Sequence, residues 1–220
     1  MSEDQNEAIK AEAATVVEQG KDLRTQVRDI TLRALSRRSL SLGEVGGVVR
    51  AVSEGVSLGL GKRGGEVKVA AREALGGLDE ALKKLAEVTR LTMQQAASQG
   101  RDFHAQDLRP ALDEMKRLEE TFLYTLSQVT NAAGGRIKEE FQSFISHGKT
   151  AGTDAGRLMA DTVADFNQRL VSSVKEGARE SATAASELKQ RLGEVGSGIL
   201  SGMADALHEK TRPDDDQKVH

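Results

Sequence analysis

The chain has 220 residues, no cysteine, no tryptophan and a formal charge of −3. The lack of cysteine excludes disulfides and thiolate sites, and the acidic balance argues against bulk attraction to nucleic acid. Aromatic residues make up 3 % of the chain and glycine contributes 22 residues, so few side chains can anchor a thick core. We therefore predict thin packing, in two or three layers of helices.

Apolar residues recur mostly at steps of three and four, and no stretch reads convincingly as a strand. The pattern predicts an all-α fold, an elongated multi-helix bundle of long amphipathic helices with coiled-coil-like packing. We divide it into a heptad helix over 1–38, a short helix and glycine-rich hinge over 39–65, a long antiparallel helical bundle over 66–210, and a disordered tail over 211–220.

Residues 1–38 carry a strict four-three alternation of apolar residues, which favours pairing with another helix. Its charges are segregated, with a net −4 over residues 1–20 and a net +4 over residues 21–38. The basic half suits a helix C-terminus, and it could also hold an anionic surface or an acidic partner. We predict a self-association seam formed by Ile9, Val16, Leu23, Val27 and Ile30.

Residues 55–65 hold five glycines and predict a hinge between helices. Gly59, Gly61 and Gly64 match the dinucleotide fingerprint G-x-G-x-x-G, but that motif needs a preceding strand and a βαβ frame. A P-loop is excluded because Lys62 is followed by Arg63 and not by serine or threonine. We therefore expect no nucleotide site here.

The helical pattern resumes at Val67, is interrupted at Gly76–Gly77, and becomes bulkiest over residues 108–145. All five phenylalanines and the single tyrosine lie between residues 103 and 166. If the chain has one compact core, we expect it in this region, with a kink or helix end at 131–135. The predicted bundle core comprises Leu112, Met115, Phe122, Leu126, Phe141, Phe166 and Leu170.

Gly148, Gly152 and Gly156 stand four residues apart, which suits either a turn or a close helix crossing. We favour the turn, because Thr153 and Asp154 can cap a following helix. That helix is predicted over residues 154–207, with large apolar residues in its first half and alanine, serine and glycine in its second. The second half offers a face for a surface or partner, formed by Leu188, Leu192, Val195, Ile199 and Met203.

The sequence offers no catalytic constellation. The four histidines stand at 104, 147, 208 and 220, and none has a metal-ligand spacing to another histidine or a carboxylate. We therefore expect no catalytic residue, no metal, no cofactor and no small-molecule substrate. The acidic N-terminus has no apolar signal region, so we expect a cytoplasmic location.

The chain resembles a proteobacterial family of unknown function over about residues 20–210. The resemblance is carried by residues 28–97, by the phenylalanine-bearing block 103–145, and by the closing run GEVGSGILSGMADAL at 193–207. It implies a helical protein and transfers no functional residues, because the family has no assigned activity. The cysteine-free, alanine-rich composition and the eleven-residue apolar stripes also resemble phasins, which coat polyhydroxyalkanoate storage granules.

The long stripes of small apolar residues have to be covered by another helix or by an apolar surface. We therefore expect a non-enzymatic, self-associating helical scaffold that forms a homo-oligomer. The alternative is a phasin-like amphipathic protein that coats a storage granule or an anionic inner-membrane surface. A nucleic-acid partner, bound through the basic residues of 21–38, is the least favoured.

Overall fold

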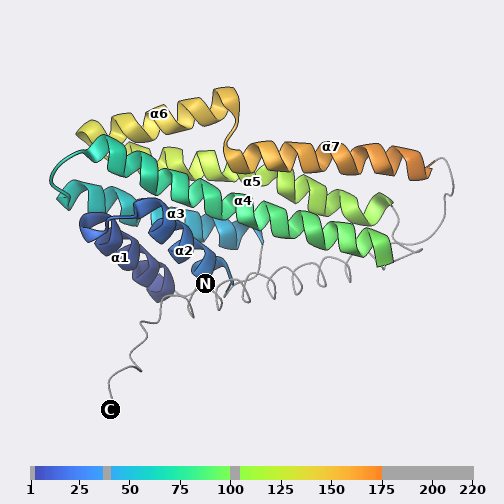
Figure 1. The fold of residues 1–220 in the computed structure, drawn as a ribbon, viewed down its shortest axis with the longest axis horizontal. Helices are drawn as coiled ribbons and strands as arrows, with labels where there is room; N and C mark the ends of the chain where they lie inside the picture. Colours follow the sequence, from blue (N-terminus) through green and yellow to red (C-terminus); the bar gives the residue numbers. More distant parts are fainter. Residues whose placement is uncertain (1–2, 37–40, 100–104, 175–220) are drawn as a thin grey trace, which may run out of the picture.

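The computed structural model describes residues 3–36, 41–99 and 105–174, which form seven helices and no strand (Figure 1). The all-α prediction is confirmed. The helices are α1 (Glu3–Gln19), α2 (Leu23–Ser36), α3 (Leu42–Lys62), α4 (Val67–Gln99), α5 (Ala105–Ala132), α6 (Gly135–Ala151) and α7 (Asp154–Val174).

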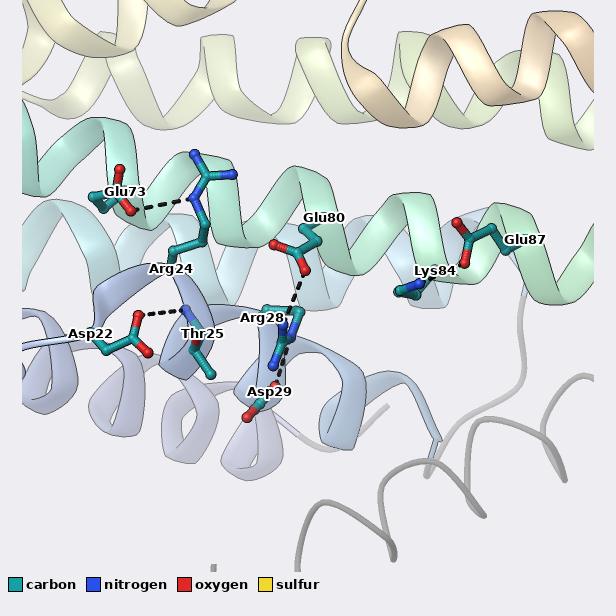
Figure 2. Close-up of polar contacts among 9 residues, drawn as sticks. All are labelled: Asp22, Arg24, Thr25, Arg28, Asp29, Glu73, Glu80, Lys84 and Glu87. Atoms are coloured by element: carbon teal, nitrogen blue, oxygen red, sulfur yellow. Dashed lines mark hydrogen bonds and ion pairs between the residues drawn. The ribbon is translucent and has the colours of Figure 1, made fainter. Parts of the chain in front are cut away.

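The first two helical hairpins, α1–α2 and α3–α4, are stacked in the same direction. Lys10 of α1 pairs with Glu54 of α3 at 3.2 Å, and Arg63 at the end of α3 donates to the carbonyl of Val17 at 2.7 Å. From the first contact to the second, the residue numbers rise along both helices, so α1 and α3 are parallel. The ion pair between Arg28 and Glu80, at 3.0 Å, belongs to an equally parallel pair, α2 and α4 (Figure 2).

The third hairpin consists of α5 and the broken pair α6–α7, and it stacks on the second. A Cβ on Gly46 of α3 would contact Thr121 of α5, and one on Gly61 would lie near Ile137, just after the α5–α6 turn. On the other side, α4 contacts first α6 and then α7. The described chain is therefore three layers of like-oriented hairpins, within the two or three layers predicted from composition.

The single helix predicted over residues 1–38 is wrong, because α1 ends at Gln19 and α2 begins at Leu23. Glycine is a poor helix former, and Gly20 stands at the break, where Asp22 caps the new helix by accepting from the amide of Thr25 at 3.3 Å (Figure 2). The chain doubles back here, so α1 and α2 contact each other.

Most residues of the predicted self-association seam are buried in the core of this chain. Leu23, Val27 and Ile30 are buried between α2 and the second layer, and Ile9 and Val16 of α1 are partly buried against the same core. The apolar stripe is therefore real, but the helices that cover its α2 half belong to the same chain.

The predicted glycine hinge is confirmed only at its end, where Gly65 has a φ of +101° in the turn between α3 and α4. Over Gly55 and Gly59, α3 continues as a helix to Lys62. These glycines allow α1 and α3 to cross closely. A Cβ on Gly55 would lie 2.4 Å from the carbonyl oxygen of Lys10, and one on Gly59 would lie 2.5 Å from that of Ala14. Glycine is needed here for the space it leaves, not for flexibility.

One continuous core connects all seven helices, from Ala13 to Phe166, so it is not confined to residues 108–145 as expected. The valine-rich α3 and the leucine- and alanine-rich α4 contribute as much of it as the phenylalanines. The predicted helix end at 131–135 is confirmed by the α5–α6 turn, where Gly135 has a φ of +55°. Predicted core residues that are buried are Leu112, Phe122, Leu126, Phe141 and Phe166.

Several predictions concern residues for which the structure gives no description. The side chains of Met115 and Leu170 are outside the described residues, as are the second half of the 154–207 helix and the predicted tail at 211–220. The predicted start of that long helix at Asp154 is confirmed. Within residues 3–36, 41–99 and 105–174, no helix is both long enough and apolar enough to cross a membrane.

Candidate functional site

A cleft of about 390 Å³ lies where α2, α4 and the α6–α7 turn meet. Its lining includes Gly76 of α4 together with Gly148 and Gly152 at the α6–α7 turn. Polar side chains from four helices converge on it, among them three arginines, one histidine and three carboxylates. The polar lining comprises Arg24, Arg72, Asp79, Glu140, Ser143, His147, Thr153, Asp154 and Arg157.

The α6–α7 turn forms one wall of this cleft. Gly152 has a φ of +76°, which glycine adopts without strain, and its amide donates to the carbonyl of Gly148 at 2.9 Å to end α6. Thr153 then caps α7, since its hydroxyl accepts from the amide of Gly156 at 2.9 Å. The turn predicted from the glycine spacing is confirmed.

The same glycines also permit close packing, which was the alternative we considered. A Cβ on Gly148 would lie 3.0 Å from Leu123 of α5, and one on Gly156 would lie 2.0 Å from the carboxyl group of Glu119. The turn and the close approach are therefore properties of the same three residues.

Asp79 of α4 caps the start of α7 from a different layer. Its carboxylate accepts from the amide of Asp154 at 2.9 Å and from that of Ala155 at 3.1 Å, and its side chain is buried, with the residue only 7 % exposed. Two of the amides that a helix start leaves unpaired are thus satisfied by an α4 side chain. The positive end of the α7 dipole also favours this negative charge.

Glu119 of α5 holds the same turn from the opposite side. One of its carboxyl oxygens accepts from the amide of Thr153 at 3.0 Å and from its hydroxyl at 3.2 Å. Carboxylates from α4 and α5 thus clamp the α6–α7 turn between them. We call Asp79 and Glu119 the carboxylate clamp.

The arginines around the cleft join helices to one another. Arg24 crosses α4 directly over Gly76 and donates through Nε to Glu73 at 3.3 Å (Figure 2). Arg72 of α4 lies 3.9 Å from Glu140 of α6. Arg157 pairs with Asp154 and donates to the carbonyls of Ala151 and Gly152, where the end of α6 carries partial negative charge.

Burial raises the pKa of Asp79, and the two amide hydrogen bonds lower it by less. The folded state therefore holds the Asp79 proton more tightly than the unfolded chain does. The contribution of Asp79 protonation to the free energy of unfolding should therefore fall as pH rises from the ordinary carboxyl pKa of about 3.9 through the raised pKa of Asp79.

The measurement is urea unfolding of the wild type and of Asp79→Asn at intervals from pH 4 to pH 7. The amide variant cannot titrate, so the difference between the two curves isolates Asp79 from the other carboxyls. The wild type should lose stability relative to the variant as pH rises. A wild type that gains stability relative to the variant over this range would contradict the assignment.

The carboxylate clamp was missed by the sequence analysis. Asp79 sits directly after Leu78 and three residues before Leu82, on a stripe otherwise made of leucine and alanine. A carboxylate on the buried side of an amphipathic helix was the available signal. Glu119 carried no such signal, because it lies among other charged residues on α5.

The arginines, the carboxylates and Thr153 of the cleft are thus arranged as helix caps and ion pairs. Among the described residues, no group of three or more histidine, aspartate or glutamate side chains could hold a metal ion. The predicted partner face at Leu188–Met203 lies beyond the described residues, so the structure does not place it at the cleft.

Comparison with known proteins identifies the family but no characterised relative. No curated protein and no solved structure matches the chain. The resemblance to an uncharacterised family predicted from the sequence is confirmed. The model of DUF6781, a family of unknown function, matches residues 1–209, and the chain therefore belongs to that family.

Proposed function

We propose that this chain is a non-enzymatic helical scaffold that associates with copies of itself. The observation that carries the proposal is the stack of three like-oriented hairpins. Stacked helical hairpins are typical of repeat proteins, which bind partners through extended faces and not through a deep catalytic pocket.

The use of polar side chains supports a scaffold. Asp79 and Glu119 cap the start of α7, and Arg28 joins α2 to α4. In an active site, such groups would converge on a substrate position, whereas here each is directed at a neighbouring helix. Their arrangement serves to hold helices in register.

Apolar side chains exposed on the second and third layers are candidates for contact with a second copy. Leu58 of α3, Val69 of α4 and Tyr124 of α5 are each about half exposed or more. Single exposed apolar residues are common, so their role has to be tested one at a time.

Static light scattering over a micromolar concentration range tests the proposal. We expect the wild type to have the mass of at least two chains. The mass should fall when glutamate replaces whichever of Leu58, Val69 and Tyr124 lies in the contact between copies. Gln128→Glu, one turn after Tyr124 and also exposed, is the matched control and should leave the mass unchanged. A single-chain mass throughout the range would overturn self-association.

A phasin-like coat protein is the second candidate. It is favoured by the helical spacing of the apolar residues Leu188, Leu192, Val195, Ile199 and Met203 in the sequence, since an amphipathic helix can lie on an apolar surface. Co-sedimentation with polyhydroxyalkanoate particles or anionic liposomes, accompanied by a gain in helicity, would support this function. Protein that stays in the supernatant in both assays would remove it.

A further inference from the structure

The described part of the first layer ends before the second layer does. Arg28 is level with Glu80, and α2 ends eight residues later at Ser36, so it stops about level with Val88. α4 runs on to Gln99. Figure 2 shows Lys84 and Glu87, which pair with each other at 2.8 Å, beyond the Arg28–Glu80 pair that joins α2 to α4.

Leu91 lies on the flank of α4 that α2 covers earlier. Leu91 stands seven residues after Lys84 and fourteen residues after Gly77. Gly77 lies against the backbone of Arg24 in α2. Residues seven apart lie on nearly the same side of a helix. Leu91 is 51 % exposed, although Val88 and Thr92 beside it are buried. We call residues 88–95 the α4 overhang.

We propose that the α4 overhang is the docking surface for the apolar stripe of residues 188–203 of the same chain. That stripe comprises Leu188, Leu192, Val195, Ile199 and Met203. The family model matches the chain through residue 209, 35 residues past the end of α7, so the stripe is part of the unit that defines the family.

The end of α7 lies at the same end of the bundle as the end of α4. α4 and α7 run in the same direction, so Val174 lies at the end of the molecule where α4 also ends (Figure 1). The 13 residues between Val174 and Leu188 can span at most about 45 Å, which is several times the usual separation of packed helices of about 10 Å. The docking surface is therefore within reach.

The short linker favours the same chain over a second copy. A segment tethered by a short linker has an effective concentration in the millimolar range, far above the micromolar concentration of another molecule. As a helix, residues 188–203 would also be about 24 Å long, enough to cover the whole flank from Val88 to Gln99, which is about 16 Å long. This inference does not depend on self-association.

The absence of native cysteine makes a direct test possible. In the double variant Leu91→Cys/Leu192→Cys, a short bismaleimide should join the two thiols within one chain in dilute solution. Tyr124→Cys/Leu192→Cys is the matched control, since Tyr124 is 63 % exposed but belongs to α5 in the third layer. We expect intramolecular cross-linking to be at least about tenfold faster in the Leu91 variant.

A cross-linking rate equal to that of the Tyr124 control would overturn the proposal. Cross-links that form only between chains would also overturn it and would assign the overhang to a second copy. Hydrogen exchange gives an independent reading in the full chain, because Leu192→Asp/Ile199→Asp should increase exchange of the amides at 88–95. Unchanged exchange there would count against docking even if the cross-linked variant misfolds.

Discussion

The variant Asp79→Ala should lower the free energy of unfolding by about 2–4 kcal/mol. The substitution leaves the amides of Asp154 and Ala155 without the acceptor that lies 2.9 and 3.1 Å away. Asp154 borders the cleft, but Ala155 is buried, so its amide in particular loses an acceptor that bulk water cannot replace. Urea unfolding followed by circular dichroism measures the change.

Asp113→Ala is the matched control for removal of a carboxylate. Asp113 is exposed and forms an ion pair with Lys116, one turn away on the same helix, at 3.5 Å. Such a pair contributes about 0.5 kcal/mol or less. If Asp79→Ala were no more destabilising than Asp113→Ala, the carboxylate clamp would have no role in stability.

The second arm of the carboxylate clamp predicts coupling between the two sites. Glu119→Ala should also destabilise the fold, because Thr153 loses the acceptor for its amide and its hydroxyl. Asp79 and Glu119 hold one turn, so the combined loss in the double variant should be less than the sum of the two single losses. Losses that add within about 0.5 kcal/mol would indicate two independent caps.

The helical class of the fold could be predicted from the sequence because periodicity reports which side of a helix is buried. Leu23, Val27 and Ile30 of the predicted self-association seam are buried within the chain, as the periodicity of an apolar stripe indicates. Its partner could not be predicted, since an apolar stripe is equally satisfied by the same chain or by a second one. The break at Gly20 decides the question by turning α2 back onto α4.

The role of individual glycines could not be predicted for a related reason. Gly55 and Gly59 stand four residues apart in a glycine-rich run, which suits either a hinge or a close crossing. The difference lies in the neighbouring helix, and α1 is about 40 residues away in the sequence. The candidate site was missed on the same ground, because Asp79 acquires its role only from amides that are 75 and 76 residues distant.

Gly77→Ala should destabilise the protein by about 1–3 kcal/mol, although alanine is the better helix former. The new Cβ would lie 2.2 Å from the carbonyl oxygen of Arg24, which is backbone at the start of α2. Relief of this overlap requires the whole of α2 to move away from α4. That movement would weaken the pairs that Arg24 and Arg28 make with Glu73 and Glu80.

Two neighbouring tests separate this overlap from a general effect of removing glycine. Gly76→Ala meets only the guanidinium end of Arg24, at 2.6 Å from Nη2, and that flexible side chain can swing aside. Its cost should largely cancel the helix-propensity gain of about 1 kcal/mol. Gly43→Ala, in α3 with no atom within 4 Å of the new Cβ, should stabilise by up to that amount.

The three variants should therefore fall in a fixed order of stability, with Gly43→Ala highest, Gly76→Ala in the middle and Gly77→Ala lowest. Thermal and urea unfolding of each variant against the wild type establish the order. A Gly77→Ala protein as stable as Gly43→Ala would mean that α2 does not lie against α4 as described. The stacking of the first layer on the second, on which both the scaffold and the α4 overhang depend, would then have to be abandoned.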